Sequence, residues 1–336
     1  MTRLDGVRSR GRRQREEGTA RGRRWFRALL AVLVTAAVVV PLTAAIRPRI
    51  PAPAPAALAP ATAATLDETY AANRANAALA SRMAAAHGDR HRAAADRTLA
   101  APSRRLLAFD GRGAGRATEV FGDLAHADRV AVLVPGSDTS LDTYGRFDAG
   151  AQALYKRLTR QTGARTAVIA WLGYTTPGTV STTVITPARA DEAAPGLREF
   201  VSELRAVTAP DVRISLLCHS YGSVVCGRAA PGLDVDDLVL LGSPGTGADS
   251  AAGLRTRARV WAARGADDWV ADVPHASVDL LFTTVGFGVD PVSPSFGARV
   301  FAAGDGGHSD YFSPGSVSLT NLARIVLGRT TEVSRA

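Results

Sequence analysis

One short stretch of the sequence, LLCHSYGSVVCG at residues 216–227, holds a serine in a setting typical of a nucleophile. The five residues centred on Ser220 differ at one position from G-x-S-x-G, the sharp strand-to-helix turn that presents a catalytic serine. The helix crosses closely over the strand at such a turn, so the residues two before and two after the serine have to be small. Gly222 meets this requirement, and Cys218, which replaces the first glycine, is still compact. The alternative is a serine in an ordinary strand-to-helix turn.

A serine hydroxyl needs a base to become a nucleophile, and the base needs a group that orients it. In proteins that use this turn, the acid and then the histidine come after the serine along the chain. His308 lies in a glycine-rich loop, GDGGHSDYF, directly after the last predicted strand, whereas no predicted strand leads to His275. We therefore expect His308 to be the base. The alternative is a surface histidine that caps the last helix.

The acid is expected after the predicted strand RARVWAARG, where the sequence GADDW offers Asp267 and Asp268. The usual arrangement at this place is a glycine, two residues and then an aspartate, which counted from Gly265 gives Asp268. Asp268 is therefore preferred over Asp267. The alternative for either residue is an exposed loop carboxylate or a helix cap.

Acyl chemistry at a serine also needs N–H donors that hold the negative charge on the oxygen of the intermediate. One donor is expected from the backbone of Tyr221, directly after the serine, and the other from the loop VLVPGSDTS. By position the second donor is the N–H of Ser137, because Gly136 before it frees the backbone to turn inward. The alternative is a plain strand-to-helix loop.

The elements that must position these residues are predicted from an alternation of apolar strands and helices after residue 129. Apolar runs such as VAVLV indicate parallel strands that helices cover on both faces. Connections of this length predict one open, doubly wound α/β sheet, which binds ligands outside the carboxyl ends of its strands. The predicted strands are RVAVLVPG, RTAVIAWLGY, VRISLLCHS, DDLVLLGSPG, RARVWAARG and GARVFAAG, and the predicted helices cover residues 141–162, 189–208, 221–230 and 314–328.

Two further segments precede this alternation. Residues 66–101 are rich in helix formers, with a break at Gly88. Residues 102–330 form the predicted α/β domain, which opens with the strand-like runs RRLLAFD and RATEVFGDL around GRGAG. A hairpin turn is expected at GRGAG, because its third glycine is misplaced for a dinucleotide-binding loop and a strand comes after it.

The positive charge of the chain is concentrated at its N-terminus. Residues 1–27 hold ten arginines and three acidic residues, whereas the rest of the chain is nearly neutral, which argues against nucleic-acid binding. Residues 28–46 carry no charge and are about long enough to cross a bilayer. This length favours a transmembrane anchor over a cleaved signal sequence, and either one exports the remainder of the chain. Residues 47–65 are rich in proline and alanine and predict an extended linker.

The chain has two cysteines, Cys218 and Cys226. Two cysteines make neither a disulfide framework nor a metal site. They flank the proposed turn, one at the end of a strand and one in a helix. Export would allow one disulfide between them, but we expect their side chains to point apart and favour two buried free thiols.

Taken together, VLVPG, WLGY, CHSYGS, LVLLGSPG, VWAARGADD and GHSDYF resemble the actinobacterial α/β-hydrolase family of unknown function, the DUF1023 type. The resemblance covers about residues 66–328. It implies an α/β-hydrolase fold and a Ser-Asp-His triad, carried here onto Ser220, Asp268 and His308. The family usually has glycine where this chain has Cys218 and often proline where it has Trp269, and the second departure bears on the shape of the acid loop.

These features predict an exported serine hydrolase, of the esterase type, that cleaves an acyl ester through an acyl-enzyme without a cofactor or metal. The expected partners are a small acyl-ester or lipid-like substrate, and a membrane through the N-terminal helix. The segment between Val270 and Phe296 is a candidate acyl pocket, and the alternative is that its apolar residues pack against the sheet. Two other functions stay open, an envelope acyltransferase with the same triad and a non-catalytic binding protein on a hydrolase fold. The apolar residues of the candidate acyl pocket are Leu280, Leu281, Phe282 and Phe287.

Overall fold

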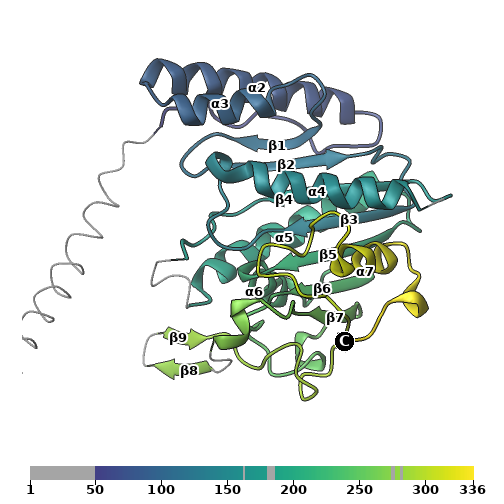
Figure 1. Cartoon of the computed structure of the whole chain (residues 1–336). Coiled ribbons are helices and arrows are strands. Elements are labelled where there is room, and N and C mark those ends of the chain that lie inside the picture. Colours follow the sequence, from purple (N-terminus) through teal and green to yellow (C-terminus); the bar gives the residue numbers. More distant parts are fainter. Residues whose placement is uncertain (1–49, 162, 180–185, 274–276, 281–282) are drawn as a thin grey trace, which may run out of the picture. The chain divides into compact units, whose positions relative to one another are not determined.

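Eight strands of the protein form one sheet, in the order β1-β2-β4-β3-β5-β6-β7-β10, in the computed structural model shown in Figure 1. The structure describes residues 50–336 except 162, 180–185, 274–276 and 281–282. The strands of this sheet are β1 (Leu106–Asp110), β2 (Arg116–Phe121), β3 (Arg129–Val134), β4 (Thr166–Leu172), β5 (Arg213–His219), β6 (Asp237–Leu241), β7 (Arg259–Ala263) and β10 (Arg299–Val300). From β4 to β10 neighbouring strands run parallel, whereas β1 and β2 join antiparallel at one edge.

This arrangement confirms the predicted α/β fold with a mostly parallel sheet flanked by helices. The helices are α2 (Leu66–His87), α3 (Arg90–Leu99), α4 (Tyr144–Thr159), α5 (Ala188–Val207), α6 (Tyr221–Ala229) and α7 (Val317–Val326), and a separate hairpin consists of β8 (Ser277–Leu280) and β9 (Thr283–Gly286). The antiparallel pairing of β1 with β2 confirms the hairpin at GRGAG. The last predicted strand, GARVFAAG, is shorter than expected, because only Arg299 and Val300 pair with β7.

The helices cover the sheet on both faces, as the unbroken apolar strands require. In β3, Val130 and Val132 belong to the core cluster that α5 and α6 close. Ala131 and Leu133, which point to the other face, belong to the cluster that α4 and α7 close. This period of two is the geometry of a strand that is buried on both sides.

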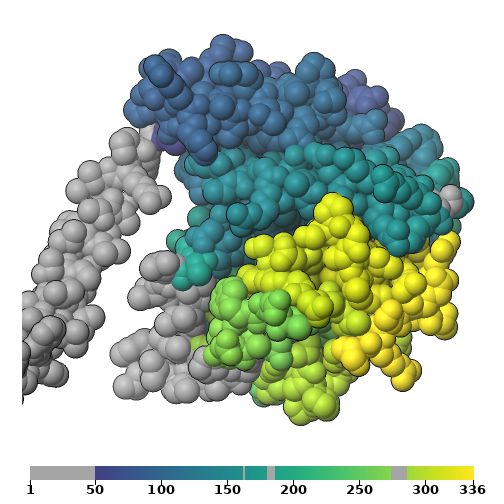
Figure 2. All heavy atoms as spheres, in the orientation of Figure 1, coloured from purple at the N-terminus to yellow at the C-terminus, as the bar shows by residue number. Residues whose placement is uncertain are grey.

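The N-terminal helices α2 and α3 lie along the β1 edge of the sheet (Figures 1 and 2). The buried Asn73 of α2 donates from its side-chain amide to the carbonyl oxygens of Leu106 and Leu107, at 3.2 and 3.0 Å. These hydrogen bonds use carbonyls that an uncovered edge strand would offer to another chain. Part of the Pro/Ala-rich segment packs here too, because the Asn76 amide donates to the carbonyl oxygen of Ala54 at 2.9 Å.

Cys218 and Cys226 form a disulfide, so the prediction of two free thiols is wrong. The two side chains do not point apart, because both face the core cluster on the α5 and α6 side of the sheet. The sharp turn at Ser220 sends α6 back along β5, which places the Cα atoms of the two cysteines 6.4 Å apart.

The predicted membrane segment, residues 28–46, lies outside the described residues, as does the basic segment before it. In the part of the chain that the structure describes, no helix has both the length and the apolar character needed to cross a bilayer.

Candidate active site

The proposed nucleophile turn lies between β5 and α6, as the sequence predicts. Ser220 comes directly after β5 and has φ 54° and ψ −127°, a backbone conformation that L-residues other than glycine rarely adopt. Its N–H donates to the carbonyl oxygen of Leu241 in the neighbouring strand at 2.9 Å. Such a conformation persists only where the surroundings hold it. Ser220 itself is 8% exposed.

Close backbone contacts explain the small residues around this turn. A Cβ atom on Gly222 would lie 2.5 Å from the carbonyl oxygen of Pro135 and 2.6 Å from that of Val134. A Cβ atom on Gly136 would lie 2.6 Å from the Cβ of Ser220. Glycine is therefore required at both positions, and the loop after β3 is held directly against the serine.

His308 and Asp268 complete a continuous chain of hydrogen bonds to Ser220. The Nε2 atom of His308 lies 2.8 Å from Ser220 Oγ, and its Nδ1 atom lies 2.8 Å from Asp268 Oδ1. Asp268 comes from the loop after β7, and His308 from the loop after β10. All three residues therefore gather at the carboxyl ends of parallel strands, where the fold predicts a site.

Asp268 is held as a carboxylate. Burial alone would raise the pKa of its carboxyl group, but hydrogen bonds from His308, Tyr311 and the Val270 N–H outweigh burial and lower that pKa to about 2. An ionised carboxylate only accepts hydrogen bonds, so Nδ1 of His308 carries the hydrogen in this pair. In the neutral ring, Nε2 is then free to accept the Ser220 hydroxyl proton.

The structure describes the alternative to Asp268 as the acid, which is Asp267, but not the alternative to His308 as the base, which is His275. Asp267 is exposed, whereas Asp268 is 2% exposed and in contact with His308. The structure thus brings Asp268, and not Asp267, to His308; the role of Asp268 as the acid stays a prediction. His275 lies outside the described residues.

The two predicted N–H donors lie on either side of Ser220. Tyr221 begins α6, and Ser137 comes after the glycine that contacts the serine. The hydrogen bonds of the described residues include none from the N–H of Ser137, and Tyr221, as the first residue of α6, has no helical acceptor one turn earlier for its N–H. Pro135, the residue before Gly136 in the same loop, is fixed because the Tyr174 hydroxyl donates to its carbonyl oxygen at 2.7 Å.

Three side chains to which the sequence analysis assigned no role contact the site. The Tyr311 hydroxyl donates to Asp268 Oδ2 and accepts from the Gly265 N–H at 3.1 Å. Trp269 is 51% exposed, and its ring centroid lies 4.6 Å from that of His308. The only sequence signal was proximity, since Tyr311 and Trp269 lie within three residues of His308 and Asp268, respectively.

His219 is the third of these side chains. Its Nε2 atom lies 2.6 Å from the backbone carbonyl oxygen of His308. Burial lowers the pKa of His219 to about 4, with a further lowering by His308, so the ring is neutral at neutral pH. A carbonyl oxygen only accepts hydrogen bonds, so Nε2 of His219 is the donor. His219 thus turns away from Ser220 and connects the serine turn to the histidine loop.

The candidate acyl pocket is described only in part. Phe287 is buried, and its ring meets that of Tyr221 edge to face with a centroid distance of 5.7 Å. Phe287 therefore packs in the core cluster on one face of the sheet, which is the alternative to a place in an acyl pocket. Leu281 and Phe282 lie outside the described residues, and Leu280 is described only as the end of β8.

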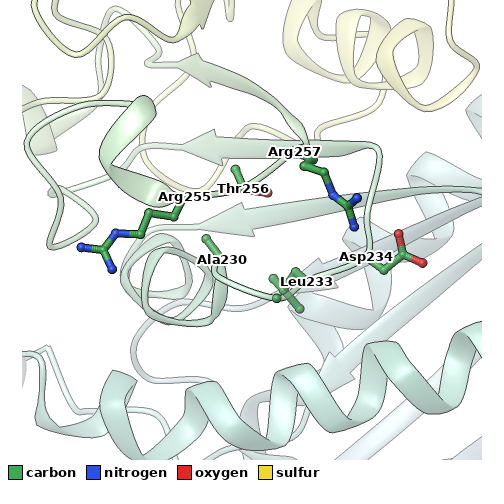
Figure 3. Close-up of a pocket in the computed structure, with 7 residues that line it drawn as sticks. Ala230, Leu233, Asp234, Arg255, Thr256 and Arg257 are labelled. Carbon is green, nitrogen blue, oxygen red and sulfur yellow. The ribbon is translucent and has the colours of Figure 1, made fainter.

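A pocket of about 150 Å³ lies elsewhere, among the segments that lead into β6 and β7 (Figure 3). Those segments enter the amino ends of the strands, at the edge of the sheet opposite the triad residues. In Figure 3 the side chains of Arg255 and Arg257 point in different directions and do not converge on one point. Elsewhere, no group of three or more His, Cys, Asp or Glu side chains among the described residues is arranged to hold a metal ion.

Known proteins resemble this chain in sequence and in fold. An uncharacterized protein of Mycobacterium tuberculosis (strain H37Rv) is 33% identical over 254 residues, which are 66% of this chain and 38% of that protein. An uncharacterized protein of Mycobacterium bovis is 34% identical over 168 residues, 46% of this chain and 63% of that protein. This chain therefore spans less than two thirds of the length of these relatives.

Among solved structures, a protein of Xanthomonas campestris described as an α/β serine hydrolase without a lid is 16% identical, with a TM-score of 0.42 over 68% of this chain and 95% of that chain. A predicted hydrolase of Thermoplasma acidophilum is 14% identical, with a TM-score of 0.42 over 68% and 96% of the two chains. A family model described as alpha/beta hydrolase matches residues 110–278, half of the chain. This match, together with the parallel sheet and the strand-to-helix turn at Ser220, means that the protein belongs to the α/β-hydrolase family.

Proposed function

We propose that the protein is a serine hydrolase that cleaves acyl esters outside the cytoplasm, with Ser220, His308 and Asp268 as its catalytic triad. The observation that carries the proposal is the unbroken chain from Asp268 through His308 to Ser220, with both distances at 2.8 Å. The family membership supports hydrolysis in general, and this chain of contacts supports a serine mechanism.

In the proposed reaction, Nε2 of His308 takes the proton of Ser220 as the serine oxygen attacks the acyl carbonyl carbon. The carbonyl oxygen gains negative charge, which the N–H groups of Tyr221 and Ser137 stabilise. Each such donor is typically worth about 10²–10³-fold in rate. His308 then protonates the leaving alcohol, and water releases the acyl group by the same steps in reverse.

Two features support an extracytoplasmic location. Both cysteines of the chain are joined in a disulfide, which forms and persists in oxidising compartments. The arginine-rich segment before the apolar residues 28–46 is the pattern of an exported chain with its N-terminus in the cytoplasm. We infer that the domain faces outward, anchored by residues 28–46 or released by cleavage.

The substrate we propose is a small acyl ester or a lipid-like ester. The exposed indole of Trp269 beside His308 supports an apolar or planar group near the leaving-group side of the site. An acyltransferase would use the same residues and differ only in the acceptor, so added alcohol acceptors would separate the two by their products.

The proposal is tested by labelling with a fluorophosphonate probe and by hydrolysis of p-nitrophenyl esters of increasing chain length. Wild-type protein should be labelled at Ser220. Ser220→Ala should lose labelling, and His308→Ala should lower the hydrolysis rate by at least about 10³-fold.

A matched control is His126→Ala, because His126 also pairs with an aspartate, Asp123, at 2.9 Å but is exposed and far along the chain from the site. This variant should retain full activity. A folded wild-type protein that is not labelled would instead favour a non-catalytic binding protein, and equal hydrolysis by all variants would refute the triad.

A further inference from the structure

The disulfide encloses the proposed nucleophile. Cys218 is two residues before Ser220, at the end of β5, and Cys226 is six residues after it, inside α6. Both side chains are completely buried. The bond therefore joins the strand and the helix whose crossing sets the conformation of Ser220.

Other contacts hold α6 against the loop after β6. A Cβ atom on Gly227 would lie 2.4 Å from the carbonyl oxygen of Thr246, so this part of the helix is held against the loop after β6. The Ser223 hydroxyl donates to the carbonyl oxygen of Ser220 at 2.6 Å, and also contacts the Ser243 hydroxyl at 2.6 Å. The disulfide supplies the covalent connection to the strand itself.

We infer that the Cys218–Cys226 disulfide is a positioning element for Ser220, and that the enzyme becomes fully active only after this bond forms. The inference rests on the proposed function of Ser220. Without the bond no covalent tie holds α6 to β5, and in the reduced protein two thiols also need more room than one disulfide in an interior that is fully buried. Loss of the bond therefore lets α6 move from β5 and relaxes the strained turn between them.

The bond forms by thiol–disulfide exchange with a disulfide donor, a protein or a small molecule such as oxidised glutathione. One cysteine thiolate attacks the donor disulfide and releases one donor thiolate. The second cysteine thiolate then attacks the mixed disulfide and releases the other. The enzyme loses two protons and two electrons, and the donor disulfide is reduced to two thiols.

This arrangement links activity to the compartment. Cytoplasmic thiols are kept reduced, so the chain would carry a displaced serine until it is exported. Esters of the cytoplasm would be spared while the protein is made. The buried position of the bond also protects it from reductants once the domain has folded.

The experiment compares protein refolded from urea with the disulfide intact and protein refolded after reduction, in the presence of reductant. Alkylation and mass measurement establish the thiol state, circular dichroism establishes folding, and the rate of fluorophosphonate labelling reports the position of Ser220. We expect labelling of the reduced, folded protein to be about 10- to 100-fold slower, the size of effect that a misplacement of about 1 Å produces. The double variant Cys218→Ala/Cys226→Ala should be equally slow, and reductant should not change its rate.

Equal labelling rates in the oxidised and reduced folded proteins would overturn the inference and leave the proposed function intact. If the reduced protein does not refold, the double variant decides, because its alanines remove the bond without adding volume to the buried site. Labelling of the double variant at the wild-type rate overturns the inference in that case. Absence of labelling in the oxidised wild type would overturn the proposed function itself, so the two failures are distinguishable.

Discussion

Gly242 offers a sharp test of the packing around the triad. It comes directly after β6, has φ +51°, and faces the acid–base pair. A Cβ atom at this position would lie 2.6 Å from Asp268 Oδ2, 3.0 Å from the Tyr311 hydroxyl and 3.1 Å from His308 Nδ1. The variant Gly242→Ala therefore adds one methyl group directly against the carboxylate that orients His308.

The expected effect of Gly242→Ala has two parts. The left-handed backbone conformation costs about 1 kcal/mol for alanine. Insertion of a methyl group into a well-packed interior costs about 1–3 kcal/mol. The free energy of unfolding should thus fall by about 2–4 kcal/mol. Because Asp268 and His308 must move, kcat on a p-nitrophenyl ester and the labelling rate should fall about 10- to 100-fold.

Gly113→Ala is the matched control. Gly113 also has a positive φ, +63°, but a Cβ atom there would meet nothing within 4 Å. This variant should lose about 1 kcal/mol from backbone strain and retain its activity. Urea unfolding and initial rates measure both effects. If the two variants have the same stability and the same rates, the close packing described for Asp268, Tyr311 and His308 is refuted.

Two further predictions concern side chains that support the triad. Asp268 stabilises the fold fully above its unfolded pKa, near 3.8, and this contribution is lost as the pH falls toward the folded pKa of about 2. Tyr311→Phe removes a hydrogen bond to the carboxylate and raises that pKa toward the unfolded value, so the urea midpoint should fall by less between pH 6 and pH 2 than in wild type, and its fall should end at a higher pH; identical profiles would contradict this role. His219→Ala should lower kcat about 10-fold, whereas His219→Gln, whose amide can donate to the same carbonyl oxygen of His308, should recover most of it; equal losses in both variants would contradict a role through that hydrogen bond.

The sequence allowed the fold to be predicted, and it indicated the three residues of the proposed triad, because both depend on simple patterns. Unbroken apolar runs such as that of β3 occur in strands buried on both faces, and their order along the chain determines which loops meet at one edge. Ser220, Asp268 and His308 each come directly after a parallel strand of the sheet or lie within eight residues of one. Because the carboxyl ends of parallel strands lie at one edge of the sheet, these three residues are expected near one another without knowledge of any particular side-chain contact.

The disulfide could not be predicted in the same way, because it depends on the direction of α6. Strand alternation alone places Cys218 on the same face as Leu216, but the face of Cys226 depends on the backbone angles of Ser220. The hydrogen bonds from Asn73 to β1 could not be predicted for a related reason. Nothing in a helix-forming sequence says which strand edge the helix covers.

Backbone contacts between loops set the geometry of this site as much as the triad side chains do. Gly136 touches Ser220, Gly242 touches Asp268, and a Cβ atom on Gly265 would lie 1.9 Å from the carbonyl oxygen of Gly306, just before His308. At each point the loops approach so closely that no side chain fits. A conservative change at these glycines should therefore disturb the triad more than a larger change in the apolar core, where volume can be redistributed among neighbours. These contacts hold the three side chains in place, but in the sequence each contact is visible only as a glycine. The sequence therefore indicates the reacting groups more clearly than the contacts that position them.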